Sequence, residues 1–159
     1  SHQNSTDKDL NLIQGNDHRM IGQLMSIVGS KYNEDRLFTL KGLYNASMSK
    51  TIIGQFDMLL SGRIHGAVQG LSQAIPTAII DYGHEPKAHK LKGFAKLYGI
   101  DEYVCDPADA DSMIAISDKL WSERKSIIRH LQMRIPQIIG LARKNFALTR
   151  MVYEKRHHV

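Results

Sequence analysis

The stretch that decides the fold is residues 56–82, FDMLLSGRIHGAVQGLSQAIPTAIIDY. It opens with a short apolar run, residues 57–60, which predicts a strand, and Ser61 and Gly62 supply a turn after it. The run over residues 77–81, TAIID, has an apolar centre and predicts a second, buried strand. Between the strands, apolar residues at helical spacing predict one face of a helix that runs into a proline: Ile64, Ala67, Val68, Leu71 and Ile75.

The chain before this stretch predicts two helices and one strand. Apolar residues with helical spacing favour a helix over residues 7–28. A short run over residues 36–40 is typical of a strand. A second helix is expected over residues 45–56, and its N-cap is either Asn45 or Ser47.

The chain after this stretch continues the alternation. A helix from Pro86 to Tyr98 is expected to stop at Gly99, where a helix-terminating glycine belongs. Residues 103–105 favour one more short strand. From Asp109 onward the pattern is helical, and Pro136 is expected to kink or divide the helix.

Apolar strands that alternate with helices are typical of a parallel sheet covered on both faces. We therefore predict an α/β fold with a doubly wound, Rossmann-like sheet over residues 1–120, followed by a basic helical tail over residues 121–159. Seven apolar residues of the tail form a stripe at helical spacing: Ile127, Ile128, Leu131, Ile135, Ile138, Ile139 and Phe146. The abrupt polar start, where a strand is normal, indicates a chain cut from a longer protein.

Positive charge is concentrated in the tail. Residues 121–159 hold nine Lys and Arg against two Glu, a net +7, so that the first 120 residues sum to −2 within a total of +5. A basic patch confined to one helical tail is more often a solvated face, or a surface for another domain, than a nucleic-acid groove. No basic strand with interleaved aromatics argues otherwise, and we expect no nucleic-acid partner.

Composition also restricts the location and the redox chemistry. With 42% apolar and 23% charged residues, the 159-residue chain has the mixture of one globular domain. It has no apolar run of membrane-spanning length, and its start, SHQNSTDKD, lacks the apolar core of a signal peptide, so we expect a cytoplasmic protein. The single cysteine, Cys105, is interpreted as a small buried side chain.

The residues with the clearest chemical potential are Arg63 and His65. They lie where a predicted strand ends and a helix begins, and ligands of parallel sheets bind beyond that edge. A helix N-terminus attracts anions there, Arg63 adds a fork for carboxylate or phosphate, and His65 can exchange a proton near neutral pH. Each residue alone is more often structural, and the joint placement makes a site as plausible as a structural role.

Other residues are expected at the same edge. Gly62 and Gly66 leave space for a ligand, and Ser61 belongs to the same turn. Tyr82 and Lys87 follow the next strand and are candidate substrate contacts. Asp81 is interpreted as a turn former, and the terminal pair His157 and His158 as a disordered end; no metal site is predicted.

Residues 56–105 resemble the signature of the polysaccharide pyruvyl transferases in order and spacing. The resemblance rests on a strand followed by S-G-R-I-H-G-A, an apolar helix, and then S-Q-A-I-P-T-A-I-I-D-Y before a helix start rich in Lys and His. His2 and Asp7 look like the polar loop that follows the first strand of the family's C-terminal half. The resemblance covers most of residues 1–120, and the tail matches in character only.

The resemblance implies the C-terminal half of a two-domain, GT-B-like enzyme. Such an enzyme transfers a pyruvyl group from phosphoenolpyruvate to a sugar or glycan, forms a ketal and releases phosphate, with no further cofactor. Arg63 and His65 fall on the family's Arg-apolar-His triplet, and the missing N-terminal half is an implied partner. A membrane-associated acceptor and a homo-oligomer stay open.

Two other functions stay open on the residues alone. One is half of a sugar-nucleotide-dependent glycosyltransferase or epimerase, which needs an acidic residue for a ribose near the strand ends. The other is a non-catalytic carbohydrate- or nucleic-acid-binding module that depends on the basic tail.

Overall fold

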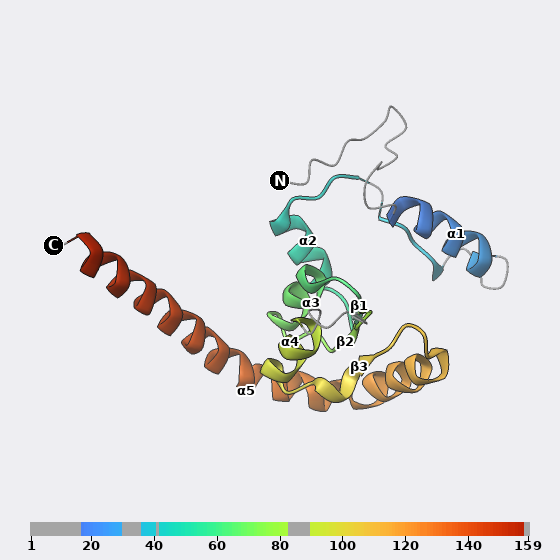
Figure 1. Ribbon diagram of the computed structural model, residues 1–159. Coiled ribbons are helices and arrows are strands. Elements are labelled where there is room, and N and C mark those ends of the chain that lie inside the picture. Colours follow the sequence, from blue (N-terminus) through green and yellow to red (C-terminus); the bar gives the residue numbers. More distant parts are fainter. Residues whose placement is uncertain (1–16, 30–35, 41, 83–89, 158–159) are drawn as a thin grey trace. The chain divides into compact units, whose positions relative to one another are not determined.

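Figure 1 shows the structure, a computed structural model in which residues 17–29, 36–40, 42–82 and 90–157 are described. The chain divides into two compact units, residues 1–43 and residues 44–159. The boundary predicted between residues 120 and 121 lies inside one long helix of the second unit.

The first unit contains helix α1 (Asp17–Gly29), which ends one residue beyond the predicted end. The predicted start of this helix, residues 7–16, lies outside the described residues, as do His2 and Asp7. The strand predicted over residues 36–40 is wrong, because this segment forms no strand. Phe38 and Leu40 are exposed there, and an extended run with no partner strand gains neither ladder hydrogen bonds nor burial.

The second unit is built on a parallel sheet of three strands in the order β1-β2-β3 (Figure 1). These are β1 (Leu59–Ser61), β2 (Thr77–Ile80) and β3 (Val104–Cys105). Leu59 is in register with Thr77, and Ile79 is in register with Val104. The central strand β2 is the most buried of the three, which explains why three of its four residues are apolar.

One helix, α2, precedes β1, and another, α3, follows it. Helix α2 (Ala46–Ile53) is capped by Asn45, whose side-chain oxygen accepts a hydrogen bond from the Met48 N–H at 2.9 Å, so Asn45 rather than Ser47 is the N-cap. Helix α3 (Ile64–Leu71) ends four residues before the predicted end at Ile75. The chain turns there through Ala74, which has a positive φ of 60°.

Helix α3 approaches the sheet closely at Gly70. A Cβ on Gly70 would lie 2.8 Å from both Leu59 Cδ2 and Thr77 Oγ1, closer than carbon and oxygen atoms tolerate. Thr77 is fully buried, and its hydroxyl donates to the Ile75 carbonyl at 2.8 Å. The missing side chain of Gly70 therefore sets how α3 lies on β1 and β2.

The next crossover is helix α4 (Lys90–Tyr98), which ends before Gly99 as predicted. Gly99 has a positive φ of 69°, and the 3-10 turn η2 (Asp101–Tyr103) follows. Two basic residues of the last helix satisfy the carbonyls at the end of α4. His130 Nε2 lies 2.9 Å from the Tyr98 oxygen, and Arg134 Nε donates to the Leu97 oxygen at 3.0 Å. Cationic and N–H groups at a helix C-terminus are stabilising.

The chain ends in helix α5 (Ala110–His157), which is 48 residues long and continuous through Pro136. Asp109 caps it, with its carboxylate accepting from the Ser112 N–H at 2.9 Å. The predicted stripe is buried at Ile127 and Leu131 and half-buried at three further positions, Ile128, Ile135 and Ile138. It is exposed at Ile139 and Phe146, so the stripe does not pack on apolar surface along its whole length.

The core of the second unit joins the sheet to three helices, with Leu71, Ile79, Ile100, Leu120 and Leu131 fully enclosed. The prediction of an α/β fold with a parallel sheet and a helical C-terminal end is confirmed. The strand order increases in one direction, so the reversal that defines a doubly wound sheet is not among the described strands. Of the helices in the described ranges, none is both long and apolar enough to cross a bilayer.

Candidate functional site

The candidate site begins at the turn between β1 and α3. Ser61 is buried, and its hydroxyl donates to the Arg63 carbonyl at 2.9 Å while accepting from the Arg63 N–H at 3.3 Å. Arg63 has an extended backbone and is the N-cap of α3. The Ser61 side chain thus fixes the conformation that brings Arg63 to the start of the helix.

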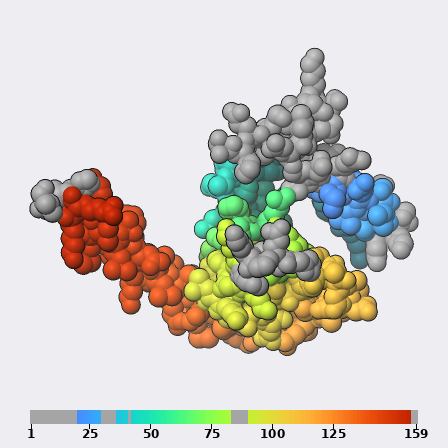
Figure 2. Space-filling view, viewed as in Figure 1, coloured from blue at the N-terminus to red at the C-terminus, as the bar shows by residue number. Residues whose placement is uncertain are grey.

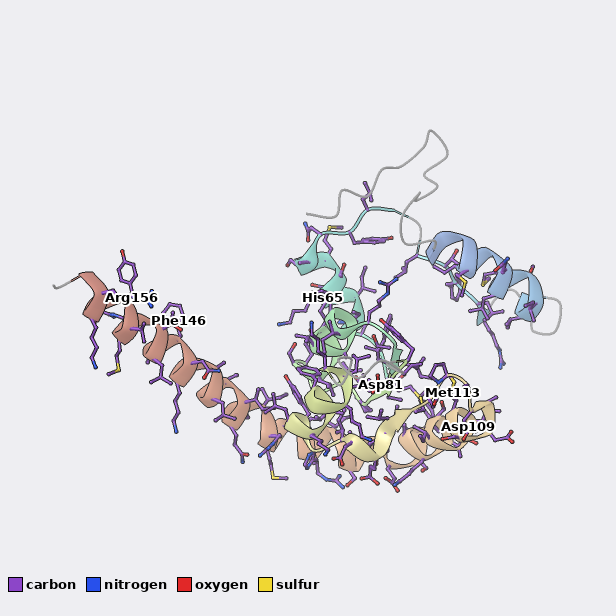
Figure 3. The ribbon with its side chains drawn as sticks, viewed as in Figure 1. His65, Asp81, Asp109, Met113, Phe146 and Arg156 are labelled. Atoms are coloured by element: carbon purple, nitrogen blue, oxygen red, sulfur yellow. The ribbon has the colours of Figure 1, made fainter. Side chains whose placement is uncertain are left out.

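Arg63 and His65 are both exposed at the first turn of α3. The Arg63 guanidinium has only donors and cannot cap the first-turn N–H groups, in keeping with the lack of a side-chain capping hydrogen bond at this position. Figure 3 labels His65 on this turn. The predicted placement of both residues at the strand-to-helix junction is confirmed, and their side chains reach solvent at the carboxyl end of the sheet.

Tyr82 lies next to this turn. A Cβ on Gly62 would be 3.5 Å from Tyr82 Cε1 and 3.8 Å from Ile80 Cβ, so the ring stands against the Gly62 backbone. Tyr82 itself is 57% exposed. The structure therefore brings together Gly62 and Tyr82, as expected for residues that follow neighbouring parallel strands. Lys87 lies outside the described residues.

Gly66 has a neighbour that the sequence did not indicate. A Cβ at this position would lie 2.6 Å from Ser61 Oγ. The space left by the glycine is therefore filled by the serine hydroxyl on this side. Close packing of α3 on the end of β1 accounts for Gly66, whether or not a ligand also approaches it.

Three aspartates lie at or shortly after the carboxyl ends of β2 and β3. The Asp81 N–H donates to the Cys105 carbonyl at 2.9 Å and extends the pairing of β2 with β3. The Asp106 carboxylate accepts from the Ala108 N–H at 2.8 Å, and Asp109 caps α5. Figure 3 labels Asp81 and Asp109 near the sheet and the start of α5. Asp106 directly follows the strand predicted over residues 103–105, and this position was the signal that could have found it.

A cavity of about 310 Å³ lies between η2 and α5, away from the β1–α3 turn. Its lining includes Tyr103, whose hydroxyl donates to the Glu123 carboxylate, and His130, which also contacts the end of α4. Glu123, Ser126, Ile127 and His130 repeat at helical spacing along α5. That spacing was visible in the sequence, but nothing there indicated that η2 would face it.

Burial controls the protonation of the groups beside the core. Burial, and then the hydrogen bond to Glu123, raise the pKa of the Tyr103 hydroxyl above its usual value. Burial raises the pKa of the Cys105 thiol, whose sulfur lies 3.6 Å from the Ile79 carbonyl oxygen. Cys105 is therefore a protonated, enclosed side chain, which confirms the prediction that it packs as a small buried residue.

Among the described residues, no three His, Cys, Asp or Glu side chains gather as metal ligands. His158 and the side chain of His157 lie outside the described part of the chain. Comparison of the chain with family models, with curated proteins and with solved structures gave no significant match.

Proposed function

We propose that this chain carries the phosphoenolpyruvate site of a polysaccharide pyruvyl transferase. One observation carries the proposal: Arg63, His65 and the start of α3 project from a fixed turn at the carboxyl edge of a parallel sheet, with Tyr82 beside them. Ligands of parallel sheets bind at this edge. The three-stranded sheet would then belong to the Rossmann-like C-terminal half of a GT-B-like enzyme.

The donor has two anionic groups, a phosphate and a carboxylate, and the turn offers two kinds of positive potential. The N-terminus of α3 presents backbone N–H groups and the positive end of the helix dipole. The Arg63 guanidinium adds a permanent charge that can hold an oxyanion through two parallel hydrogen bonds. Tyr82 supplies an exposed ring and hydroxyl beside the turn, suited to a sugar or the donor.

The reaction needs a proton donor near the methylene carbon of the donor. Protonation there gives a methyl group and an oxocarbenium-like carbon, which one sugar hydroxyl attacks with loss of its proton. A second hydroxyl of the same sugar then displaces phosphate, and the product is a ketal plus inorganic phosphate. We assign the proton transfer to His65 because it is exposed on the first turn of α3 and an imidazole can both donate and accept a proton. The partners are phosphoenolpyruvate, a sugar or glycan acceptor, and the implied N-terminal half.

The test separates donor binding from catalysis. Arg63→Ala removes a charge-assisted contact worth about 1.5 to 3 kcal/mol, so phosphoenolpyruvate affinity measured by calorimetry should fall roughly ten- to hundredfold. Arg143→Ala, which removes an exposed arginine of α5, is the matched control and should leave affinity unchanged. Unchanged donor affinity in Arg63→Ala would place the anion site elsewhere.

His65→Gln keeps a hydrogen-bonding group but cannot exchange a proton at neutral pH. Donor affinity should stay near the wild-type value, while phosphate release with a diol-bearing glycan should fall about 10²-fold or more. Wild-type turnover in His65→Gln would exclude the proposed proton transfer.

One observation favours a second function, the sugar-nucleotide-dependent enzyme. Asp81 directly follows β2, the strand next to the β1–α3 turn, and this is where nucleotide-binding sheets hold a ribose with an acidic residue. If this function is correct, the chain binds a uridine diphosphate sugar more tightly than phosphoenolpyruvate. Asp81→Asn should then weaken binding of the nucleotide sugar and leave phosphoenolpyruvate binding unchanged.

A further inference from the structure

The last part of α5, residues 139–156, is amphipathic and has an exposed apolar face. We refer to it as the terminal segment; Figure 2 shows it in orange to red. The half-buried residues that pack against the core end at Ile138. Seven large apolar side chains beyond that point are exposed: Ile139, Leu141, Phe146, Leu148, Met151, Val152 and Tyr153.

Most of these side chains share one side of the helix. Ile139, Phe146 and Tyr153 repeat every seven residues and form one row. Leu141, Leu148 and Val152 form a second row beside it. The strip between the two rows holds Ala142, Asn145 and, at its C-terminal end, Arg156, and the rows with this strip cover about half of the helix circumference. Thr149 lies on this face too, and its hydroxyl donates to the Asn145 carbonyl at 3.0 Å, so its polar group is satisfied within the helix.

Basic residues border the apolar face on both sides. Arg143 and Arg150 each lie four residues after a member of the first row, Ile139 and Phe146 respectively. Along the second row, Lys144 lies four residues before Leu148, and Lys155 lies three residues after Val152. Long basic side chains at such a border can rest on apolar surroundings while their charges reach polar groups.

The positive charge of the terminal segment favours an anionic partner. It has five Lys and Arg against the single Glu154, a net +4 of the chain's +5. Two copies of so basic a face repel each other, which disfavours self-association. A basic-bordered apolar face with Phe146 and Tyr153 on it suits an anionic lipid surface, which receives apolar side chains and attracts the flanking cations. Figure 3 labels Phe146 and Arg156 on the segment.

We propose that the terminal segment binds along the surface of an anionic lipid bilayer. The apolar rows enter the region between headgroups and acyl chains, and the bordering Arg and Lys side chains contact lipid phosphates. This proposal rests on α5 alone and does not depend on pyruvyl transfer.

The test uses the 159-residue chain and vesicles of two compositions, pure phosphatidylcholine and phosphatidylcholine with about one third phosphatidylglycerol. We expect the protein to sediment with the anionic vesicles at least tenfold more strongly than with the neutral ones. Raising the salt from about 0.1 M to 1 M should release it, because the Debye length falls to about 3 Å.

The variant Phe146→Glu/Leu148→Glu places charge in both apolar rows at exposed positions and should abolish sedimentation. Met133→Glu/Gln137→Glu adds the same charge at two exposed positions of α5 outside the segment, and should bind like the wild type. Circular dichroism confirms that all variants are folded.

Three results would overturn the proposal. These are no binding to either vesicle type, equal loss of binding in the two double variants, and concentration-dependent dimerisation by light scattering that the Phe146→Glu/Leu148→Glu change alone abolishes. The last result would assign the face to a second copy of the chain. Phosphoenolpyruvate affinity, measured on the same proteins, should be the same throughout, so failure here is distinguishable from failure of the proposed function.

Discussion

The two parts of α5 have similar patterns and different surroundings. From Ala110 to Ile138 the apolar stripe packs on β2, β3, η2 and α4, with Leu120 and Leu131 fully enclosed. From Ile139 onward the same kind of stripe is exposed, with Phe146 at 78%. A periodic stripe therefore predicts that a helix has an apolar face, but not which part of that face the same unit covers.

The largest expected difference between the two parts comes from trimming a leucine in each. Leu131→Ala should lower the free energy of unfolding by about 2 to 5 kcal/mol, because it leaves a cavity in a closely packed core. Leu148→Ala should change it by less than about 0.5 kcal/mol, because Leu148 is already in contact with solvent. Chemical denaturation measures both, and comparable losses would mean that the terminal segment packs on the unit.

A smaller difference is expected in how the free energy of unfolding depends on pH. It comes from the hydrogen bond between Tyr103 and Glu123, which lies on the packed part of α5. The pKa of Tyr103 is raised in the folded state, whereas the unfolded chain ionises its tyrosines near pH 10. The raised pKa of Tyr103 therefore adds to the free energy of unfolding. This addition is complete below about pH 10 and is lost as the pH rises from there toward the folded-state pKa.

We expect the free energy of unfolding to fall above about pH 10 and to fall less steeply in Tyr103→Phe. Burial also raises the pKa values of Tyr98 and Cys105, which act in the same direction, so the informative quantity is the difference between variant and wild type. Tyr153→Phe on the terminal segment is the matched control. If the free energy of unfolding of Tyr103→Phe falls with pH as steeply as that of the wild type, Tyr103 is not the source of this pH dependence.

The smallest expected effect is at Gly140, where a Cβ would meet nothing within 4 Å. Gly140→Ala gains about 1 kcal/mol of helix propensity, so amides over residues 141–156 should exchange roughly fivefold more slowly. The midpoint of thermal unfolding should stay unchanged, because the terminal segment adds little to the packed core. A midpoint raised by several degrees would show that both parts of α5 unfold together.

Much of the sheet was predictable because its signals are local. An apolar run predicted β2 to within one residue, Asn45 was one of two predicted N-caps for α2, and Gly99 marked the end of α4. The early end of α3 was not predictable, since Ile75 has the right spacing but Ala74 turns the chain before it. The strand expected at residues 36–40 failed for a related reason: apolar residues do not reveal whether a partner strand exists.

The candidate site was predictable in part. Its place at the strand-to-helix turn followed from the order of the elements, and the presence of Tyr82 at the same edge as Gly62 followed from the parallel arrangement of their strands. The position of Ser61 against Gly66 did not, because it depends on how closely α3 approaches β1. The cavity beside Tyr103 and His130 depends in the same way on the packing of η2 against α5.

The fit between Ser61 and Gly66 makes these two positions interdependent. The Cβ of an alanine at position 66 collides with the Ser61 hydroxyl, which hydrogen-bonds to the Arg63 backbone. An alanine at position 61 lacks this hydroxyl and so removes both the collision and the hydrogen bonds. Related chains should therefore exchange the two residues together, a glycine at 61 admitting a larger residue at 66. Such exchanges would appear as covariation between a strand and the helix after it, with no change in the arginine between them.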